Sequence, residues 1–313
     1  MAGEVSPPSR DKEWDGPVVP LRNPGDAMSV ETERSIATMR MPAGLGGLLP
    51  ALTLIGLFFV VPVLALLLRS VTDPAPGLQN YAALLGDGTY VRVFFNTFLV
   101  AAVVTIVTVL VAFPVAWMLA IMPPALASVM FGIIILSMWT NLLTRTYAWM
   151  VLLQRTGVIN RALMATGIID QPLPLINNLT GVTIGMVYIM LPFMILPLVG
   201  TLRAIDPMTL RAAALCGASP FQAFRRILLP LSLPGIAAGG LMVFVMSLGY
   251  FVTPALLGGT SNMMLAEMIA QLIQSLLNWG LGSAAAFILL IATMALYALQ
   301  LRLVGARRAT GGI

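Results

Sequence analysis

The sequence predicts an all-α membrane protein that crosses the bilayer six times. Of its 313 residues, 59% are hydrophobic and only 9% are charged, whereas soluble domains carry about 25% charged residues. Mean hydropathy is +0.95. A soluble globule of this length could not bury so much apolar surface, and disorder requires the opposite composition. The apolar residues also fall into six separate runs, which sets the expected number of spans.

Each apolar run reaches the roughly 20 residues that a helix needs to cross the hydrocarbon core. Pro114 interrupts the second run, and Pro192 and Pro197 interrupt the fourth. Membrane helices tolerate such prolines because neighbouring groups can satisfy the freed carbonyls. The expected spans are residues 46–68, 94–122, 127–153, 179–202, 235–257 and 281–304.

Two regions are expected on either side of residue 42. Residues 1–42 carry seven acids, five bases and six prolines, which is typical of a disordered tail. Residues 43–313 are expected to form the transmembrane domain.

The distribution of basic residues predicts the orientation in the membrane. Basic residues beside spans favour the inner face, and placing both termini inside puts 12 bases on that face and five on the other. We therefore expect a cytoplasmic tail and cytoplasmic termini. The five outer bases are Arg69, Arg92, Arg145, Arg155 and Arg161.

Several chemistries are excluded by missing residue types. Histidine is absent, Cys216 is the only cysteine, and Lys12 is the only lysine and has no phosphate-binding glycines around it. These facts argue against an imidazole or cysteine metal site, a histidine-based triad, a disulfide and a P-loop. Only Asp206 and Glu267 are acidic beyond residue 170, so we expect no enzyme and no cofactor bound by this chain. The net charge of +5 fits membrane orientation better than binding of nucleic acid.

The polar segment at residues 203–234 separates the fourth and fifth spans. Asp206 followed by Pro207 predicts an N-cap and the first position of a short helix over 207–216. Gly217 is placed to end that helix, since glycine readily adopts the left-handed conformation that closes a helix. The segment therefore begins with a short capped helix at the inner membrane surface.

A second short helix is expected directly after the first. Ser219 and Pro220 repeat the N-cap and first-turn pattern, and Pro230 and Pro234 are expected to bound the start of the fifth span. The whole segment predicts a helix–turn–helix that lies under the membrane and can receive another protein surface. We refer to it as the 203–234 loop.

The spacing in this loop resembles the EAA loop of ABC importer permeases. In that family the short helix docks in a groove on the cytoplasmic ATPase. One position departs from the pattern: the leading glutamate of the family is Arg211 here. The residues that carry the match are Ala212, Ala213, Gly217, Ala218, Phe224, Ile227, Leu229, Pro230, Pro234 and Gly235. The resemblance implies that ATPase coupling involves Arg211, Ala212, Ala213, Gly217, Ala218, Ser219, Phe221, Phe224 and Pro230.

Further motifs resemble the spermidine/putrescine permease family, and the similarity covers about residues 50–305. They lie at 144–153, 157–160, 167–173, 187–197 and 278–284. The resemblance implies the type I ABC importer permease fold in a bacterial inner membrane, most similar to the first of two permease subunits. It also implies a second, homologous permease as heterodimer partner, cytoplasmic ATPase subunits that hold ATP and magnesium, and an extracytoplasmic solute-binding protein. Membrane lipid is the remaining expected partner.

Polar residues within or beside spans are the candidates for a substrate path, because burying them in lipid is unfavourable. A polyamine needs carboxylates and aromatic faces. Arg145 would repel a cation, so an amino-acid-like, opine or other small anionic or zwitterionic solute stays open. A stand-alone secondary transporter or channel is a further alternative. The candidates are Asn96, Asn141, Arg145, Tyr147, Trp149, Asp170 and Glu267; tyrosine and tryptophan at a membrane boundary are also typical interfacial anchors.

Overall fold

The computed structural model describes residues 43–259 and 262–309, with side chains described at 48–259 and 262–299. All regular secondary structure in these ranges is helical, as the composition predicts. The expected tail at 1–42 lies outside the described residues. The chain divides into two units, Met1–Val60 and Val61–Ile313. The described part of the first unit consists of α1 (Ala43–Ile55) and the π-helix η2 (Gly56–Val60).

Five helical stretches of the described chain are long and apolar enough to cross a membrane. A sixth is obtained if two helices joined by a sharp bend count as one span. The polytopic all-α prediction is therefore confirmed. The five stretches are Leu48–Thr72, Gly88–Ile121, Leu179–Arg203, Pro220–Leu248 and Trp279–Leu299, and the bent pair covers Pro124–Met138 and Leu142–Ala165.

The expectation of one continuous third span over 127–153 is wrong. Helix α5 (Pro124–Met138) makes an angle of 93° with the segment Leu142–Ala165, which begins with α6 (Leu142–Leu153) after a three-residue break. Asn141 causes the new start, because its side-chain oxygen accepts hydrogen bonds from the backbone N–H groups of Leu143 and Thr144 at 2.8 and 3.4 Å. This is ordinary N-cap behaviour, and it fixes the first turn of α6.

The expected limits of the fifth span are also wrong. The helix runs without interruption from α10 (Pro220–Ala223) through the π-helix η3 (Phe224–Leu228) into α11 (Leu229–Leu248). Pro230 sits in the first turn of α11 and Pro234 lies inside it, so neither proline bounds the span. A π-helical turn already changes the hydrogen-bond spacing before these prolines, which lets the chain continue as a helix. The separate helix α12 (Val252–Leu257) follows Gly249.

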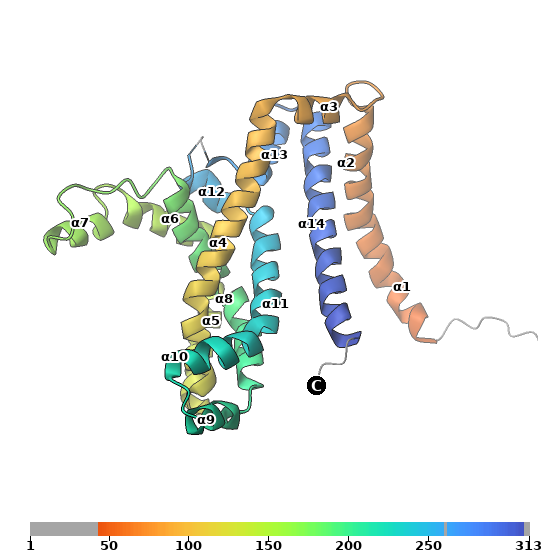
Figure 1. Cartoon of the computed structure of the whole chain (residues 1–313). Helices are drawn as coiled ribbons and strands as arrows, with labels where there is room; N and C mark the ends of the chain where they lie inside the picture. Colours follow the sequence, from red (N-terminus) through yellow and green to blue (C-terminus); the bar gives the residue numbers. More distant parts are fainter. Residues whose placement is uncertain (1–42, 260–261, 310–313) are drawn as a thin grey trace, which may run out of the picture. The chain divides into compact units, whose positions relative to one another are not determined.

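The main core of the second unit lies among α4 (Gly88–Ile121), α8 (Leu179–Arg203) and α11, which run side by side (Figure 1). Helix α8 is central, and its methionines at 186, 190 and 194 are fully buried. A smaller cluster joins α3 (Gln79–Gly86) and the N-terminal part of α4 to α13 (Leu265–Gln274) and α14 (Trp279–Ala309). Helix α14 also packs against α2 (Val61–Thr72). The remaining helices are α7 (Val158–Ala165) and α9 (Pro207–Leu215).

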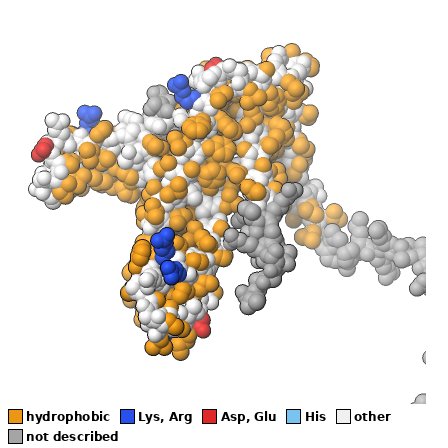
Figure 2. Space-filling view, viewed as in Figure 1, with side chains coloured by type: hydrophobic (Ala, Val, Ile, Leu, Met, Phe, Trp, Pro, Cys, Tyr) orange, Lys and Arg blue, Asp and Glu red, His pale blue; other side chains and the backbone are white. Residues whose placement is uncertain are grey.

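Large apolar side chains cover most of the exposed face in Figure 2. Trp139 is 86% exposed, and many leucines and phenylalanines of the candidate spans point away from the core. Soluble monomers do not present apolar patches of this extent. A lipid environment explains why so many large apolar residues point outward.

Candidate functional site

The 203–234 loop folds as two capped helices. Asp206 accepts a hydrogen bond from the backbone N–H of Met208 at 2.8 Å and so caps α9. Gly217 ends this helix with φ of +79°, the left-handed conformation that glycine adopts without a Cβ clash. Both local predictions are confirmed, and they fix the direction in which the chain leaves α9.

The second helix begins with a reciprocal pair of hydrogen bonds. The hydroxyl of Ser219 accepts from the backbone N–H of Gln222 at 3.3 Å, and the Gln222 side-chain oxygen accepts from the backbone N–H of Ser219 at 2.9 Å. This is a capping box, with Pro220 in the first turn. The expected second helix is therefore present, although it continues directly into α11.

Apolar side chains protrude from the loop into solvent. Leu215 is 90% exposed and Phe221 is 68% exposed, and Figure 2 shows basic side chains over the neighbouring α10 region. Exposed apolar groups with polar or charged neighbours are typical of a protein-binding surface. Of the expected coupling residues, Arg211, Ala212, Gly217, Ser219, Phe221 and Pro230 are exposed, and Ala213, Ala218 and Phe224 are half-buried.

Phe224 links the loop to the transmembrane core. Its ring meets the ring of Phe113 on α4 edge to face, with centroids 5.6 Å apart and planes at 88°. Aromatic pairs prefer this geometry. The π-turn that carries Phe224 thus packs directly against a membrane helix.

Helices α8 and α11 approach closely where the loop joins the core. A Cβ added at Gly235 would lie 2.5 Å from Oγ1 of Thr201, and one at Gly239 would lie 2.7 Å from the sulfur of Met194. Such glycines let two backbones come together. The two helices that flank the loop in sequence are therefore tightly packed against each other.

Arg145 lies in a polar group between α6 and the start of α12. The hydroxyls of Thr146 and Thr253 are 3.4 Å apart. Burial raises the pKa of Tyr250, while a hydrogen bond with Thr253 and the positive charge of Arg145 act in the opposite direction. The Nε atom of Arg145 is buried and has no hydrogen-bond partner among the described residues. This leaves one N–H of the guanidinium directed at no protein acceptor.

Glu267 lies in the first turn of α13, two residues after Leu265, which contacts α4. The Thr97 hydroxyl accepts a hydrogen bond of 2.7 Å from the backbone N–H of Leu265, which fixes the start of α13 beside half-buried Asn96. Burial raises the pKa of the Glu267 carboxyl, and a hydrogen bond with the backbone of Met264 opposes this. One carboxyl oxygen, Oε2, is buried and has no partner within the described chain.

The other candidates for the substrate path have different surroundings. Asn141 caps α6, as described above. Trp149 packs edge to face on Tyr188 of α8, with centroids 5.6 Å apart, and Tyr147 is half exposed. Asp170 is exposed in the segment between α7 and α8, with no interaction to the described residues. The seven candidates thus belong to several separate places.

Long-range contacts also reveal polar residues that sequence reasoning did not select. Thr253 contacts both Thr146 and Tyr250, and the charge of Arg145 acts on Tyr250. Asn160 of α7 donates to the backbone of Gln154 and exchanges hydrogen bonds with the backbone of Leu173. Thr146 and Thr253 are 107 residues apart, so no local pattern predicts this contact, whereas the partners of Asn160 lie within 13 residues of it.

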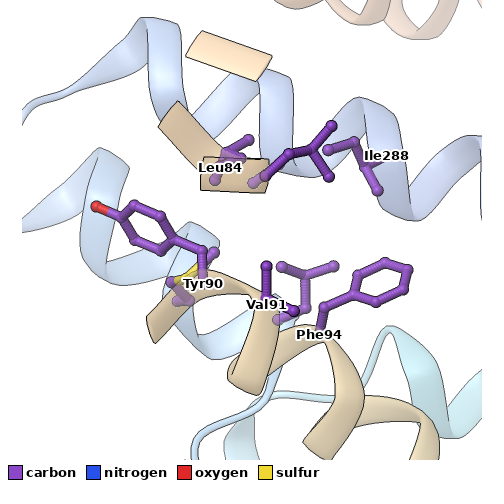
Figure 3. A pocket seen from close by; sticks show the side chains of 9 residues that line it. Leu84, Tyr90, Val91, Phe94 and Ile288 are labelled. Atoms are coloured by element: carbon purple, nitrogen blue, oxygen red, sulfur yellow. The ribbon is translucent and has the colours of Figure 1, made fainter. Parts of the chain in front are cut away.

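An apolar cavity of about 110 Å³ lies among α3, α4, α13 and α14. Leu84, Val91, Phe94 and Ile288 line it, and the hydroxyl of Tyr90 points away from Val91 and Phe94 (Figure 3). A charged solute would find no compensating group there. We therefore do not place the substrate path in this cavity.

Apolar helices long enough to cross a membrane, a tightly packed α4–α8–α11 core and a loop of two capped helices with exposed apolar side chains fit a membrane permease. Residues 82–309 match the family of binding-protein-dependent transport system inner membrane components. The chain belongs to this family and is the transmembrane permease subunit of an ABC importer, a multi-pass inner-membrane transport protein. Because the family depends on a binding protein, the stand-alone transporter or channel is not retained.

Curated relatives cover most of the chain. The chain is 35% identical over 243 residues to the spermidine/putrescine transport system permease protein PotB of Salmonella typhimurium, covering 78% of this chain and 83% of that protein. It is 34% identical to PotB of Escherichia coli K12, over 78% and 86% of the two chains. It is also 37% identical to the inner membrane ABC transporter permease protein YdcU of Escherichia coli, over 59% and 63%. The expected likeness to this permease family is confirmed.

Solved structures show the same fold. A bacterial alginate ABC transporter in complex with an alginate pentasaccharide-bound periplasmic protein contains a chain that matches with a TM-score of 0.68. The match covers 86% of this chain and 96% of that chain, at 16% identity. The type I importer permease fold expected from the resemblance is thereby confirmed.

Proposed function

We propose that this chain is one of two permease subunits of a polyamine importer, with a spermidine- or putrescine-like solute. The observation that carries the proposal is 35% identity to PotB over 83% of that protein's length. The complete importer adds a second, homologous permease, cytoplasmic ATPase subunits that bind ATP and magnesium, and an extracytoplasmic binding protein. Both termini of this chain face the cytoplasm in this arrangement.

The 203–234 loop is the surface through which the ATPase acts. Exposed Leu215 and Phe221 supply apolar contacts for the ATPase, and Arg211 adds a charge where related loops have glutamate. A displacement of α9 and α10 passes to α4 through the contact between Phe224 and Phe113. It passes to α8 and α11 through their close crossing at Gly235. The loop and these helices then move as one body, which suits a rigid-body alternating-access step.

Glu267 is the group in the chain best suited to attract a polyamine. Its buried Oε2 has no protein partner in the described part, and a desolvated carboxylate gains most from a cation that pairs with it. A solute ammonium group at this oxygen would supply the missing partner. The carboxylate would then favour passage of cations over anions.

Arg145 supports a second candidate, import of a small anionic or zwitterionic solute. Its unpartnered buried Nε could donate to a solute carboxylate, as guanidinium groups commonly do. A zwitterion could use Arg145 and Glu267 together, whereas a polyamine gains only from the carboxylate. The two candidates therefore differ in the effect of removing each charge.

Uptake by the reconstituted importer tests the proposal. Both permeases, the ATPase and the cognate binding protein are placed in proteoliposomes, and labelled putrescine, spermidine and an amino-acid solute are compared. We expect ATP-dependent uptake of the polyamines, reduced strongly by Glu267→Gln. Transport of the amino-acid solute alone, with a strong loss in Arg145→Gln, would replace the first candidate by the second.

A further inference from the structure

A groove of about 400 Å³ opens where the 203–234 loop meets the ends of two membrane helices. Trp117 and Ile121 contribute from the last turns of α4, and Arg203 contributes from the end of α8. Leu210 and Arg211 of α9 form the opposite side. The groove thus combines two guanidinium groups with an apolar wall, and no solute-path candidate lines it.

Arg203 is held in place by two contacts. Its Nη2 donates to the backbone carbonyl of Leu119 at 3.2 Å, and its guanidinium lies over the ring of Phe131, 5.4 Å from the centroid. A guanidinium carries five N–H donors. The contact with Leu119 is its sole hydrogen bond to the described residues, so the fixed side chain retains donors for another acceptor.

Arg211 provides a second charge on the other side of the groove. Its one contact within the described chain is a weak one, from Nη1 to the sulfur of Met208 at 4.0 Å. Asp206 is the acid nearest in sequence, and its carboxylate already caps α9 by accepting from the Met208 N–H. The described residues contain no ion pair for either arginine. Two unneutralised guanidinium groups on facing sides favour an anion between them.

The apolar wall identifies the source of that anion. Ile121 is 71% exposed at the end of a helix long enough to span the membrane, and half-exposed Trp117 lies one turn earlier. Tryptophan near a helix end is typical of the headgroup level of a bilayer. Free phosphate would use the arginines alone, whereas a phospholipid would also cover the exposed apolar side chains. At about 30 Å³ per water, the volume of the groove equals that of roughly a dozen water molecules. This is enough for a phosphate and a small headgroup.

We propose that this groove is a binding site for an anionic phospholipid of the adjacent leaflet, with Arg203 and Arg211 on its phosphate. Acyl chains leave the groove along Trp117 and Ile121 into the bilayer. The lipid then bridges the end of α8 and the docking helix α9. Because no part of the site touches the solute-path candidates, the inference holds whichever solute the importer carries.

Lipid binding to the intact importer tests this site. The purified complex in neutral detergent is titrated with phosphatidylglycerol or phosphatidylcholine, and bound lipids are counted by native mass spectrometry. Paired Arg203→Gln and Arg211→Gln substitutions are compared with Arg226→Gln, which removes a charge from the same loop outside the groove. Arg211→Lys serves as a second variant that keeps the charge without the guanidinium fork.

We expect the paired variant to weaken phosphatidylglycerol binding about tenfold or more, because charge-assisted phosphate contacts are lost. Arg226→Gln and phosphatidylcholine binding should change little, and Arg211→Lys alone should give an intermediate loss. An equal loss in Arg226→Gln would overturn the site in favour of general charge attraction. Full competition by inorganic phosphate would assign the groove to a free anion. Weaker ATPase retention with unchanged lipid binding would assign Arg211 to the ATPase interface.

Discussion

Gly235 of α11 lies so close to Thr201 of α8 that no side chain fits between them. A Cβ at residue 235 would meet both Oγ1 and Cβ of Thr201, at 2.5 and 2.8 Å. Rotating the threonine cannot move its Cβ, so relief requires a backbone shift. The helices on either side of the 203–234 loop are therefore packed tightly against each other near the point where the loop joins them.

Gly235→Ala should destabilise the permease by about 1–3 kcal/mol, the usual effect of overpacking a close contact. The measurement is the thermal unfolding midpoint of the purified importer in detergent. Gly200→Ala is the matched control, because a Cβ there meets nothing within 4 Å. Equal midpoints for the two variants would show that the α8–α11 crossing is looser than described.

Gly217→Val should weaken ATPase binding without preventing membrane insertion. The φ of +79° strains any β-branched residue, although a Cβ would meet nothing within 4 Å, so the effect comes from the backbone alone. Asparagine tolerates the left-handed region better, so Gly217→Asn should retain more ATPase. Copurified ATPase per permease is the measurement. If valine and asparagine behaved alike, the conformation of Gly217 would not be the cause.

Phe224→Leu should reduce the coupling of ATP hydrolysis to transport more than it reduces binding of the ATPase to the loop. The edge-to-face pair with Phe113 contributes about 0.5–1.5 kcal/mol beyond area burial. We expect near-normal ATPase retention and a lower ratio of transport to ATP hydrolysis. Phe221→Leu, at an exposed position, should instead lower ATPase retention. A double-mutant cycle with Phe113→Leu, in which the unfolding free energy is measured, should give a non-zero coupling energy between the two rings. Effects of the two substitutions that simply add would argue against the contact.

Asp87 should give the N-terminus of α4 a stability that depends on pH. A hydrogen bond from the backbone of Thr89, with a further one from its side chain, holds the pKa of Asp87 below its usual value. A carboxyl whose pKa is lower in the folded than in the unfolded state stabilises the folded state. This stabilisation is complete at pH values above the pKa of the unfolded state, about 3.9. This contribution is lost as pH falls through the folded value.

Asp87→Asn isolates this effect, because asparagine can still cap the helix but does not titrate. The thermal midpoint of the wild type minus that of the variant should shrink on acidification from neutral pH to about pH 3. A difference that stays constant over that range would contradict the role of the charge.

Local sequence signals predicted the caps of the 203–234 loop correctly. The Asp206–Pro207 and Ser219–Pro220 pairs and Gly217 each act within a few residues, so their conformations can be inferred from the chain alone. Asn141 offered the same kind of signal. Its polarity near a span suggested a role in the substrate path, whereas the structure uses it to start α6 after the bend.

Non-local packing explains what the sequence could not supply. Thr97 accepts a hydrogen bond from Leu265, 168 residues away, and Gly235 approaches Thr201 across a helix crossing. Pro230 and Pro234 suggested a helix boundary, but the helix continues through both prolines after the π-turn at Phe224–Leu228. A π-turn has no clear sequence signature, so the continuation could not be predicted from the chain. The contact between Thr146 and Thr253 near Arg145 likewise joins residues 107 positions apart.

The most direct test of the central claim is putrescine uptake into proteoliposomes that contain the complete importer and its binding protein. ATP hydrolysis is measured in parallel. We predict ATP-dependent uptake by the wild type, a strong loss in Glu267→Gln with the ATPase still bound, and a smaller effect of Arg145→Gln. Uptake that does not require ATP, or uptake limited to anionic solutes, would contradict a polyamine permease driven through the 203–234 loop.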